Sequence, residues 1–288
     1  MSPDRKEGRS RVTIGRADAP RGAVDLGGRT RIIAPIAGAT PDALAAEIAA
    51  LPGHPVDLVE WRVDPLLAAL PLRPGSASID EAGTARSDGA PRGDFRATAL
   101  AAIEAVWTGV VSACPLPVLA TIRTSAEGGE AALDSGDYAE LVARLAGLAD
   151  AVDVEIGREG SEEIIAAARE RGAVVVSSAH DFAATPASDV LLSTLEAMDA
   201  AGAEVLKIAC WANDAADTAR VLAVQAEARS RFGRPVIAIA MGGAGALTRF
   251  AGSRMGCAAT FATVGVASAP GQFTAEATRG VLDLVEQG

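Results

Sequence analysis

Short apolar runs rich in β-branched residues recur along the chain and alternate with segments of helical periodicity. Eight of these runs have the length and near-continuous hydrophobicity of strands that are buried on both faces. The runs begin at Arg31, Val56, Pro117, Ala151, Ala173, Glu204, Pro235 and Ala258. Alternation of such strands with helices predicts a parallel α/β fold.

Alanine- and leucine-rich segments lie between the runs and predict the helices. SEEIIAAARERG is expected to start with Ser161 as its N-cap and to end at Gly172. Eight strand–helix units in 288 residues predict a (β/α)₈ TIM barrel, which typically needs about 250 residues. A doubly wound sheet is the alternative, but the sequence has no GxGxxG after the first strand and no GxxxxGK[ST] motif.

Three segments fall outside this repeat. Residues 1–10 are polar and are expected to form a disordered tail before a single barrel domain at 11–288. Residues 11–29 could form a short hairpin that closes the barrel floor. Residues 71–96 are rich in Gly, Pro, Ser and Asp, and predict a long flexible insertion after the second strand.

The charge and cysteine content narrow the function classes. With 37 acidic and 26 basic side chains the net charge is −11, and a chain without a basic block is a poor nucleic-acid binder. No apolar run approaches the roughly 18 residues of a membrane span, and the first residues lack the apolar core of a secretory signal. The three cysteines share no CxxC spacing, which favours a reducing cytoplasm over a disulfide frame or a zinc site.

Lysine occurs only twice, and Lys207 lies in the apolar strand VLKIAC. Burial penalises an ammonium ion, so the pKa of such a lysine should fall. A neutral amine is a nucleophile that can attack a ketone and form a Schiff base. The alternative is a structural lysine in a buried ion pair with Asp153 or Glu155.

Chemistry in a barrel of this kind sits at the carboxyl ends of the strands, where other polar residues interrupt the apolar runs. His180 ends the strand next to that of Lys207, about 5 Å away, so both could reach one ligand. A histidine titrates near neutral pH and can move protons in both directions, although a structural role is the more frequent case for a lone histidine.

Three arginines near strand ends could form a cationic pocket in an otherwise acidic protein: Arg62, Arg123 and Arg249. Arginine in a pocket usually binds a carboxylate or a phosphate through two hydrogen bonds. The alternative is that each arginine pairs with a nearby carboxylate of the chain, for which the candidates are Glu60, Asp64 and Glu127.

Six motifs in order resemble the type I 3-dehydroquinate dehydratases over roughly residues 24–287. They are VEWRVD at 59–64, TIRTSAEGGE at 121–130, SSAHDF at 177–182, LKIA at 206–209, TRFAG at 248–252 and ASAPGQ at 267–272. Each motif alone is weak, but six in order at predicted strand ends or loops are specific. The resemblance implies a (β/α)₈ barrel of the shikimate pathway that converts 3-dehydroquinate to 3-dehydroshikimate and water, without metal or cofactor, and that forms a homodimer.

The same resemblance implies residue roles. Lys207 would form the Schiff base, His180 would donate and accept protons, and Glu127 would orient His180. Substrate-binding positions would be Glu60, Arg62, Arg123, Arg249, Ser268 and Gln272, with Arg249 facing the substrate carboxylate. Met241 and Phe261 would line the pocket.

Two features depart from the family pattern, and three rival functions remain. The 71–96 insertion has no clear counterpart in the family, and GGAGAL after Met241 replaces polar residues. One rival is a class I aldolase with a phosphate site near the glycines at 242–245. Another is a magnesium enzyme of enolase type, with Lys207 as base and oxygen ligands from Glu60, Asp153, Glu155 and Asp181. The third is a catalytically silent barrel that only binds a carboxylate.

Overall fold

The fold is built around one parallel sheet of eight strands. The computed structural model describes residues 11–15, 20–70, 78–79, 85–86, 92–265 and 273–287. In chain order the sheet contains β3 (Arg31–Ile36), β4 (Leu58–Arg62), β7 (Val118–Thr121), β8 (Ala151–Glu155), β9 (Val174–Asp181), β10 (Val205–Trp211), β11 (Val236–Met241) and β12 (Ala259–Phe261). Strands that follow one another in this order are neighbours from β3 to β11, and β12 pairs with β3. The Ala258 N–H donates to the Val236 carbonyl at 2.9 Å, which brings the two ends of the sheet together.

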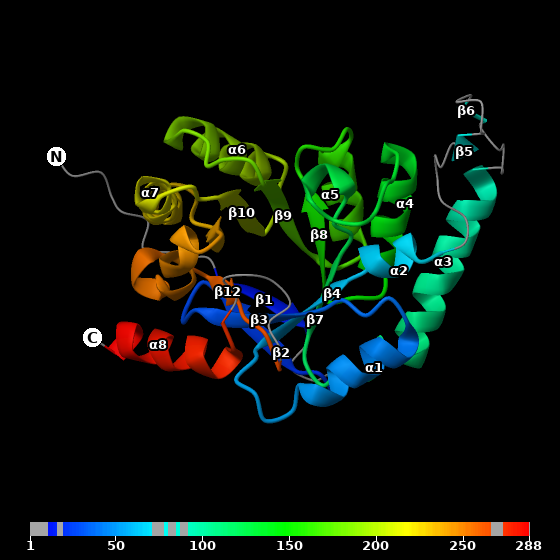
Figure 1. The fold of residues 1–288 in the computed structure, drawn as a ribbon, viewed down its shortest axis with the longest axis horizontal. Coiled ribbons are helices and arrows are strands. Elements are labelled where there is room, and N and C mark those ends of the chain that lie inside the picture. Colours follow the sequence, from blue (N-terminus) through cyan, green and yellow to red (C-terminus); the bar gives the residue numbers. More distant parts are fainter. Residues whose placement is uncertain are drawn as a thin grey trace.

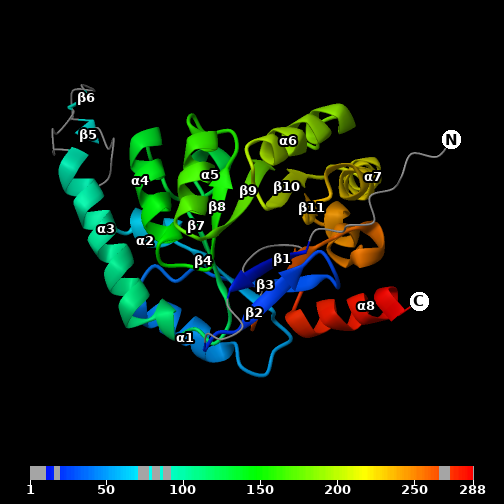
Figure 2. The same cartoon turned by 180° about the vertical axis from the view of Figure 1, so that it is seen from behind.

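Helices surround this barrel on the outside, as Figures 1 and 2 show from opposite sides. They are α1 (Pro41–Ala50), α2 (Asp64–Ala68), α3 (Arg92–Gly109), α4 (Ser135–Ala146), α5 (Ser161–Glu170), α6 (Ser188–Ala200), α7 (Ala215–Phe232) and α8 (Ala275–Gln287). Four short 3₁₀ helices complete the described elements: η1 (Val111–Ala113), η2 (Ser125–Glu127), η3 (Ala244–Phe250) and η4 (Ser253–Met255). The predicted TIM barrel and its eight strands are therefore confirmed, and the doubly wound alternative is wrong. After β11 the chain forms η3 and η4 in place of an α-helix.

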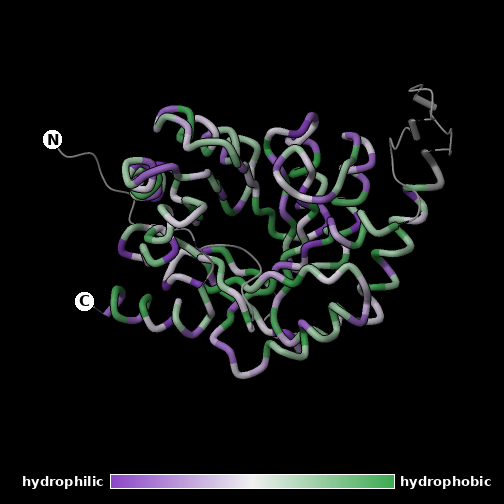
Figure 3. Tube along the Cα trace, in the orientation of Figure 1, coloured by the Kyte–Doolittle hydropathy of each residue, from purple (hydrophilic) through white to green (hydrophobic). Residues whose placement is uncertain are grey.

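Side chains alternate between two cores along each strand, as the period of two requires. In β10, Leu206 and Ile208 pack outward against the helices, whereas Val205 and Ala209 point into the barrel. Hydrophobic positions follow the strands in Figure 3, while the helices carry both kinds of residue. Inward positions in the first half of the strands are mostly apolar, with Ile33, Leu58, Leu119, Ala151, Val176, Val205, Ile237 and Ala259 in one cluster, so the lower half of the barrel is a packed core.

A hairpin closes the bottom of the barrel. β1 (Val12–Gly15) pairs in antiparallel register with β2 (Ala23–Leu26). Its buried side chains Ile14 and Leu26 belong to the same cluster as Leu58 and Leu119, which lie in the first half of their strands. The predicted hairpin at the barrel floor is therefore confirmed.

Two sequence-based boundaries need correction. Residues 92–96 of the predicted insertion belong to α3, so the insertion ends earlier than expected. Within the rest of it, β5 (Ser78–Ile79) pairs with β6 (Ala85–Arg86). The N-cap of α5 is Gly160, at φ 76°, and Ser161 is the first helical residue. Gly172, at φ 86°, does follow the end of α5 as predicted. The expected tail at 1–10 lies outside the described residues.

No helix in the described part of the chain is both long and apolar enough to cross a membrane.

Candidate active site

A cavity of about 430 Å³ opens at the carboxyl ends of the strands, opposite the hairpin. Its lining residues are Pro35, Glu60, Arg62, Arg123, Gly128, His180, Phe182, Lys207, Ala209, Trp211, Ile239, Met241, Gly242, Arg249 and Phe261. Eight of the eleven predicted site residues are in this lining. This follows from the strand period, because inward positions of adjacent strands converge on the barrel axis.

Lys207 extends from the middle of β10 into the floor of this cavity and is 4% exposed. Its Nζ lies 3.4 Å from an Asp153 oxygen and 3.5 Å from a Glu60 oxygen. On its other side, Nζ lies 4.8 Å from the centroid of the Phe261 ring, within the range of a cation–π contact. The buried ion pair considered from the sequence thus exists with Asp153, and the amine still borders the cavity.

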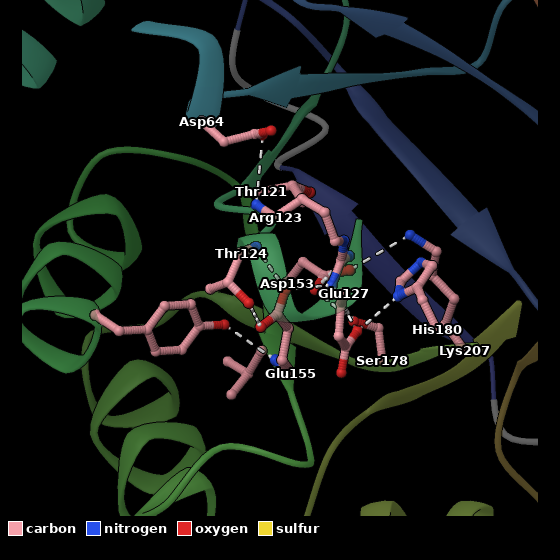
Figure 4. A network of polar contacts seen from close by, with 12 residues as sticks. Asp64, Thr121, Arg123, Thr124, Glu127, Asp153, Glu155, Ser178, His180 and Lys207 are labelled. Atoms are coloured by element: carbon pink, nitrogen blue, oxygen red, sulfur yellow. Dashed lines mark hydrogen bonds and ion pairs between the residues drawn. The ribbon is translucent and has the colours of Figure 1, made fainter. Parts of the chain in front are cut away.

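Arg123 is the hub of a buried polar network beside Lys207 (Figure 4). Its guanidinium lies 3.0 Å from Asp153, 2.8 Å from Glu155 and 3.1 Å from Glu127. Burial alone would lower the pKa of Arg123, but the surrounding carboxylates outweigh it and raise that pKa. Arg123 therefore pairs with the buried carboxylates of Asp153 and Glu155 and with the half-buried carboxyl group of Glu127, and this accounts for most of its hydrogen bonds.

Asp153 joins this network to the Lys207 amine. One of its oxygens accepts hydrogen bonds from Arg123 at 3.0 Å and from the Ser178 hydroxyl at 2.6 Å, and the other faces Lys207. Burial would raise the pKa of Asp153, but Arg123 and Lys207 lower it overall. Asp153 is thus a carboxylate anion beneath Lys207.

His180 and Glu127 form a hydrogen-bonded pair at the cavity wall. Nδ1 of His180 lies 2.8 Å from Oε2 of Glu127, which leaves Nε2 as the other titrating nitrogen. Burial, helped by the nearby Arg123 and Lys207 cations, lowers the pKa of His180 well below its usual value. Burial raises the pKa of Glu127 to about 8, although Arg123 opposes this. A neutral imidazole can accept a proton, so the pair suits general acid–base chemistry.

Arg62 is held by Asp64 through two short hydrogen bonds, from Nε at 2.7 Å and from a terminal nitrogen at 2.6 Å. Burial lowers the pKa of the Arg62 guanidinium, but its hydrogen bond to Asp64 and the Glu60 charge raise it overall. The arginine–carboxylate pairing that the sequence left open is therefore present for Arg62 and for Arg123.

Arg249 differs from both. Its hydrogen bond to the Phe261 carbonyl is 3.5 Å long, and its buried Nε has no partner in the described part of the chain. Burial is the only cause acting on the pKa of Arg249, and it lowers that pKa. A buried guanidinium nitrogen without a partner is costly, and because Arg249 also lines the cavity, its charge is a candidate partner for an anionic ligand.

The remaining predicted residues are placed as follows. Met241 and Phe261 line the cavity, and Glu127 lies just behind the lining, against His180. Ser268 and Gln272 lie outside the described residues. Sequence reasoning missed Phe182 and Trp211, which are 52% and 40% exposed at the cavity. Phe182 directly follows β9 and Trp211 is the last residue of β10, so their positions at the ends of strands could have identified them.

The carboxylates that the magnesium alternative would need as metal ligands are bound to other groups of the protein. Asp153 and Glu155 are bound to Arg123, and Asp181 accepts the Ala183 and Ala184 N–H groups outside the cavity. Among the described residues, no group of His, Cys, Asp and Glu side chains is arranged to hold a metal ion.

The glycine-rich segment after Met241 serves close packing. A Cβ on Gly245 would lie 2.2 Å from the Ala240 carbonyl oxygen, and the Trp211 ring covers Gly242, whose φ is 81°. The phosphate site of the aldolase alternative needs free backbone N–H groups. The Gly245 and Ala246 N–H groups instead donate to the carbonyls of the turn.

Comparison with known proteins agrees with this geometry. A family model described as type I 3-dehydroquinase matches residues 32–288. A 3-dehydroquinate dehydratase of Listeria monocytogenes serotype 4b is 33% identical over 264 residues, covering 90% of this chain and 94% of that protein. A Salmonella typhimurium protein of the same name is 32% identical, with the same coverage of both chains.

Solved structures show the same fold. The type I 3-dehydroquinate dehydratase of Clostridium difficile aligns with a TM-score of 0.79 at 25% identity, covering 96% of this chain and 98% of that one. The 3-dehydroquinate dehydratase of Geobacillus kaustophilus aligns with a TM-score of 0.75 at 28% identity, covering 96% and 97%. The shared fold extends over nearly the whole of each chain.

Proposed function

This chain belongs to the type I 3-dehydroquinase family, and we propose that it dehydrates 3-dehydroquinate to 3-dehydroshikimate through a Schiff base on Lys207. The observation that carries the proposal is the position of Lys207 in the cavity. Its amine is buried, and the His180–Glu127 pair and Arg249 line or border the same cavity. These groups are a nucleophile, a proton carrier and a site for the substrate carboxylate.

In the proposed reaction Lys207 first gives up a proton to His180, and its amine then attacks the substrate ketone. Loss of water from the carbinolamine, assisted by His180, gives an iminium ion. The iminium withdraws electrons and acidifies the neighbouring C–H bond, from which His180 removes the proton to give an enamine. The enamine expels the β-hydroxyl group, which leaves as water with a proton from His180. Hydrolysis of the imine then releases the product and restores the amine.

The walls of the cavity place the substrate for these steps. Arg249, which has no carboxylate partner among the described residues, is suited to the substrate carboxylate, and Glu60, Arg62 and Arg123 border the space that the substrate hydroxyl groups would occupy. Fixing the reacting carbon in one pose can contribute up to about 7–11 kcal/mol of barrier reduction. Ser268 and Gln272 are retained as substrate-binding residues on the family resemblance alone.

The same resemblance supports three broader proposals. The enzyme acts in the shikimate pathway of aromatic amino-acid biosynthesis, it works in the cytoplasm, and it forms a homodimer. Each of these rests on family membership and not on a feature of the cavity.

The test combines turnover with chemical trapping. Purified protein added to 3-dehydroquinate should produce the absorbance of the conjugated enone of 3-dehydroshikimate. Borohydride added with substrate should inactivate the enzyme irreversibly and add the mass of the reduced adduct at Lys207. Lys207→Met should abolish both turnover and trapping.

Three other results would contradict the proposal. Turnover that resists borohydride and is lost to a chelator would favour metal chemistry. Cleavage of a carbon–carbon bond would favour an aldolase. Binding of a carboxylate ligand that persists in Lys207→Met, in a protein without turnover, would favour a silent barrel.

A further inference from the structure

A second buried aspartate, Asp64, connects two parts of the site that are separate in the sequence. It follows β4 at the start of α2, its side chain is fully buried, and it does not line the cavity. We propose that Asp64 is a positioning residue that holds both Arg62 and the loop carrying Glu127. This inference rests on the proposed function, because it names the residue that holds the His180–Glu127 pair of that reaction in position.

Four hydrogen bonds converge on the Asp64 carboxylate. Oδ1 accepts from Nε of Arg62 at 2.7 Å and from the Arg123 backbone N–H at 3.4 Å. Oδ2 accepts from the other Arg62 nitrogen at 2.6 Å and from the Glu130 backbone N–H at 3.1 Å. Each oxygen thus binds one side-chain donor and one backbone donor, and Figure 4 shows the bond between Asp64 and Arg123.

The backbone donors place Asp64 at both ends of the loop that contains η2. Arg123 precedes this loop and Glu130 ends it, while Glu127 lies between them. The loop is tightly folded, because the Gly129 N–H donates to Thr124 O at 2.8 Å and a Cβ on Gly129 would lie 2.1 Å from Arg123 O. Holding its two ends therefore fixes where the Glu127 carboxylate meets His180.

The charge of Asp64 is needed for this arrangement. All four neighbours are donors, so both oxygens must accept. An asparagine would turn an NH₂ group toward two donors in either orientation, and at least two of the four hydrogen bonds would be lost. Because Arg62 is a substrate-binding candidate and Glu127 orients His180, loss of Asp64 should affect both binding and turnover.

Asp64→Asn and Asp137→Asn make a matched pair for the test. Asp137 is 1% exposed and forms a similar ion pair with Arg96 at 2.7 Å, but on α4 and outside the cavity lining. Asp64→Asn should raise KM and lower kcat by about 10-fold each, with faster hydrogen–deuterium exchange of amides 124–131. Asp137→Asn should leave kcat and that exchange within about two-fold of wild type.

Arg62→Met separates the two actions of Asp64. It removes the ion pair but leaves Asp64 bound to the Arg123 and Glu130 N–H groups, so KM should rise while exchange at 124–131 changes by less than about two-fold. The inference is wrong if Asp64→Asn raises KM only, or if its exchange at 124–131 matches that of Asp137→Asn. Hydrogen–deuterium exchange does not depend on turnover. An inactive wild-type protein would therefore overturn the proposed function, while the exchange at 124–131 would still test whether Asp64 holds the loop.

Discussion

The two sides of the cavity differ in whether their buried charged groups have partners within the protein. On the acidic wall, formed by Glu60, Glu127, Asp153, Glu155 and Arg123, each carboxylate accepts a hydrogen bond from the protein or lies against a cation of the protein. On the apolar wall, formed by Ile239, Met241, Phe261 and Arg249, the described residues offer no partner to Nε of the arginine. Lys207 lies between the walls, 3.4 Å from Asp153 and 4.8 Å from the Phe261 centroid.

This difference separates what the protein organises before binding from what the ligand completes. The polar groups of the acidic wall already have protein partners without substrate. They can therefore hold His180, Glu127 and the Lys207 amine in place without rearranging during the reaction. The apolar wall keeps one cation unsatisfied, so it gains most from an anion. Under the proposed function, the protein therefore holds the reactive groups in place, and Arg249 recognises the substrate.

Replacing Arg123 tests the acidic wall and should have the largest effect. Arg123→Met leaves the buried carboxylates of Asp153 and Glu155 and the half-buried Glu127 without their shared cation, and breaking a buried ion pair in this way costs about 3–5 kcal/mol. Urea unfolding at neutral pH would measure the loss. Each carboxylate left unpaired has a raised pKa in the folded state, so the loss should shrink as pH falls toward the usual carboxyl range of about 4.

A surface arginine provides the control for that measurement. Arg96 also contacts two carboxylates, Asp137 and Glu140, but its side chain is 37% exposed. Solvent reaches the Arg96 side of these pairs and only Asp137 is buried, so Arg96→Met should lose less stability than Arg123→Met. Equal losses in the two variants would mean that the ion pairs of the acidic wall stabilise the protein no more than a surface pair does.

The two walls also differ in how far the sequence could predict them. The strands were predictable because their apolar runs are continuous, and inward positions such as Glu60 and Arg62, or Ser178 and His180, follow from the period of two. The carboxylate partner of each arginine could not be predicted, because it depends on how the loops fold. Asp64 meets Glu130 only where the η2 loop folds back, and no local pattern encodes that contact.

Backbone geometry limited the prediction at other places too. The glycine-rich segment after β11 suggested an altered loop, but its 3₁₀ geometry depends on how closely Gly245 approaches Ala240. The cap of α5 was misplaced by one residue, because Gly160 takes the left-handed conformation that Ser161 would adopt only with strain. The missing partner of Arg249 Nε could be recognised only in three dimensions.

Replacing Arg249 tests the apolar wall and should separate stability from binding. Arg249→Met removes a buried guanidinium with an unsatisfied nitrogen, so the free energy of unfolding should stay level or rise. Loss of a charge-assisted bond to the substrate carboxylate, about 1.5–3 kcal/mol, should raise KM by about 10- to 100-fold. Steady-state kinetics and urea unfolding of one preparation measure both quantities.

A charge-preserving variant sharpens this result. Arg249→Lys keeps the cation but loses the planar pair of donors, so its KM should fall between those of wild type and Arg249→Met. If KM in Arg249→Met stayed within about two-fold of wild type, the substrate carboxylate would bind elsewhere in the cavity.

The smallest expected effect concerns the proton carried by the acidic wall. Because the pKa of Glu127 is about 8 while that of His180 is far below its usual value, the pair gives up its last acidic proton near pH 8. Glu127 can then accept a hydrogen bond from Nδ1–H and leave Nε2 free as a base, so kcat/KM should rise with pH toward about 8. In Glu127→Gln the amide oxygen still accepts from Nδ1–H, but nothing titrates there.

The acid limb of kcat/KM should therefore move to lower pH in Glu127→Gln, where only His180, with its lowered pKa, remains to titrate. The weaker neutral hydrogen bond should reduce the plateau kcat by about 5-fold, equivalent to about 1 kcal/mol. Kinetics across the pH range measure both changes. If the acid limb of kcat/KM stayed at the same pH in Glu127→Gln, the titration would belong to a group other than Glu127. The acidic wall would then position His180 without controlling its protonation.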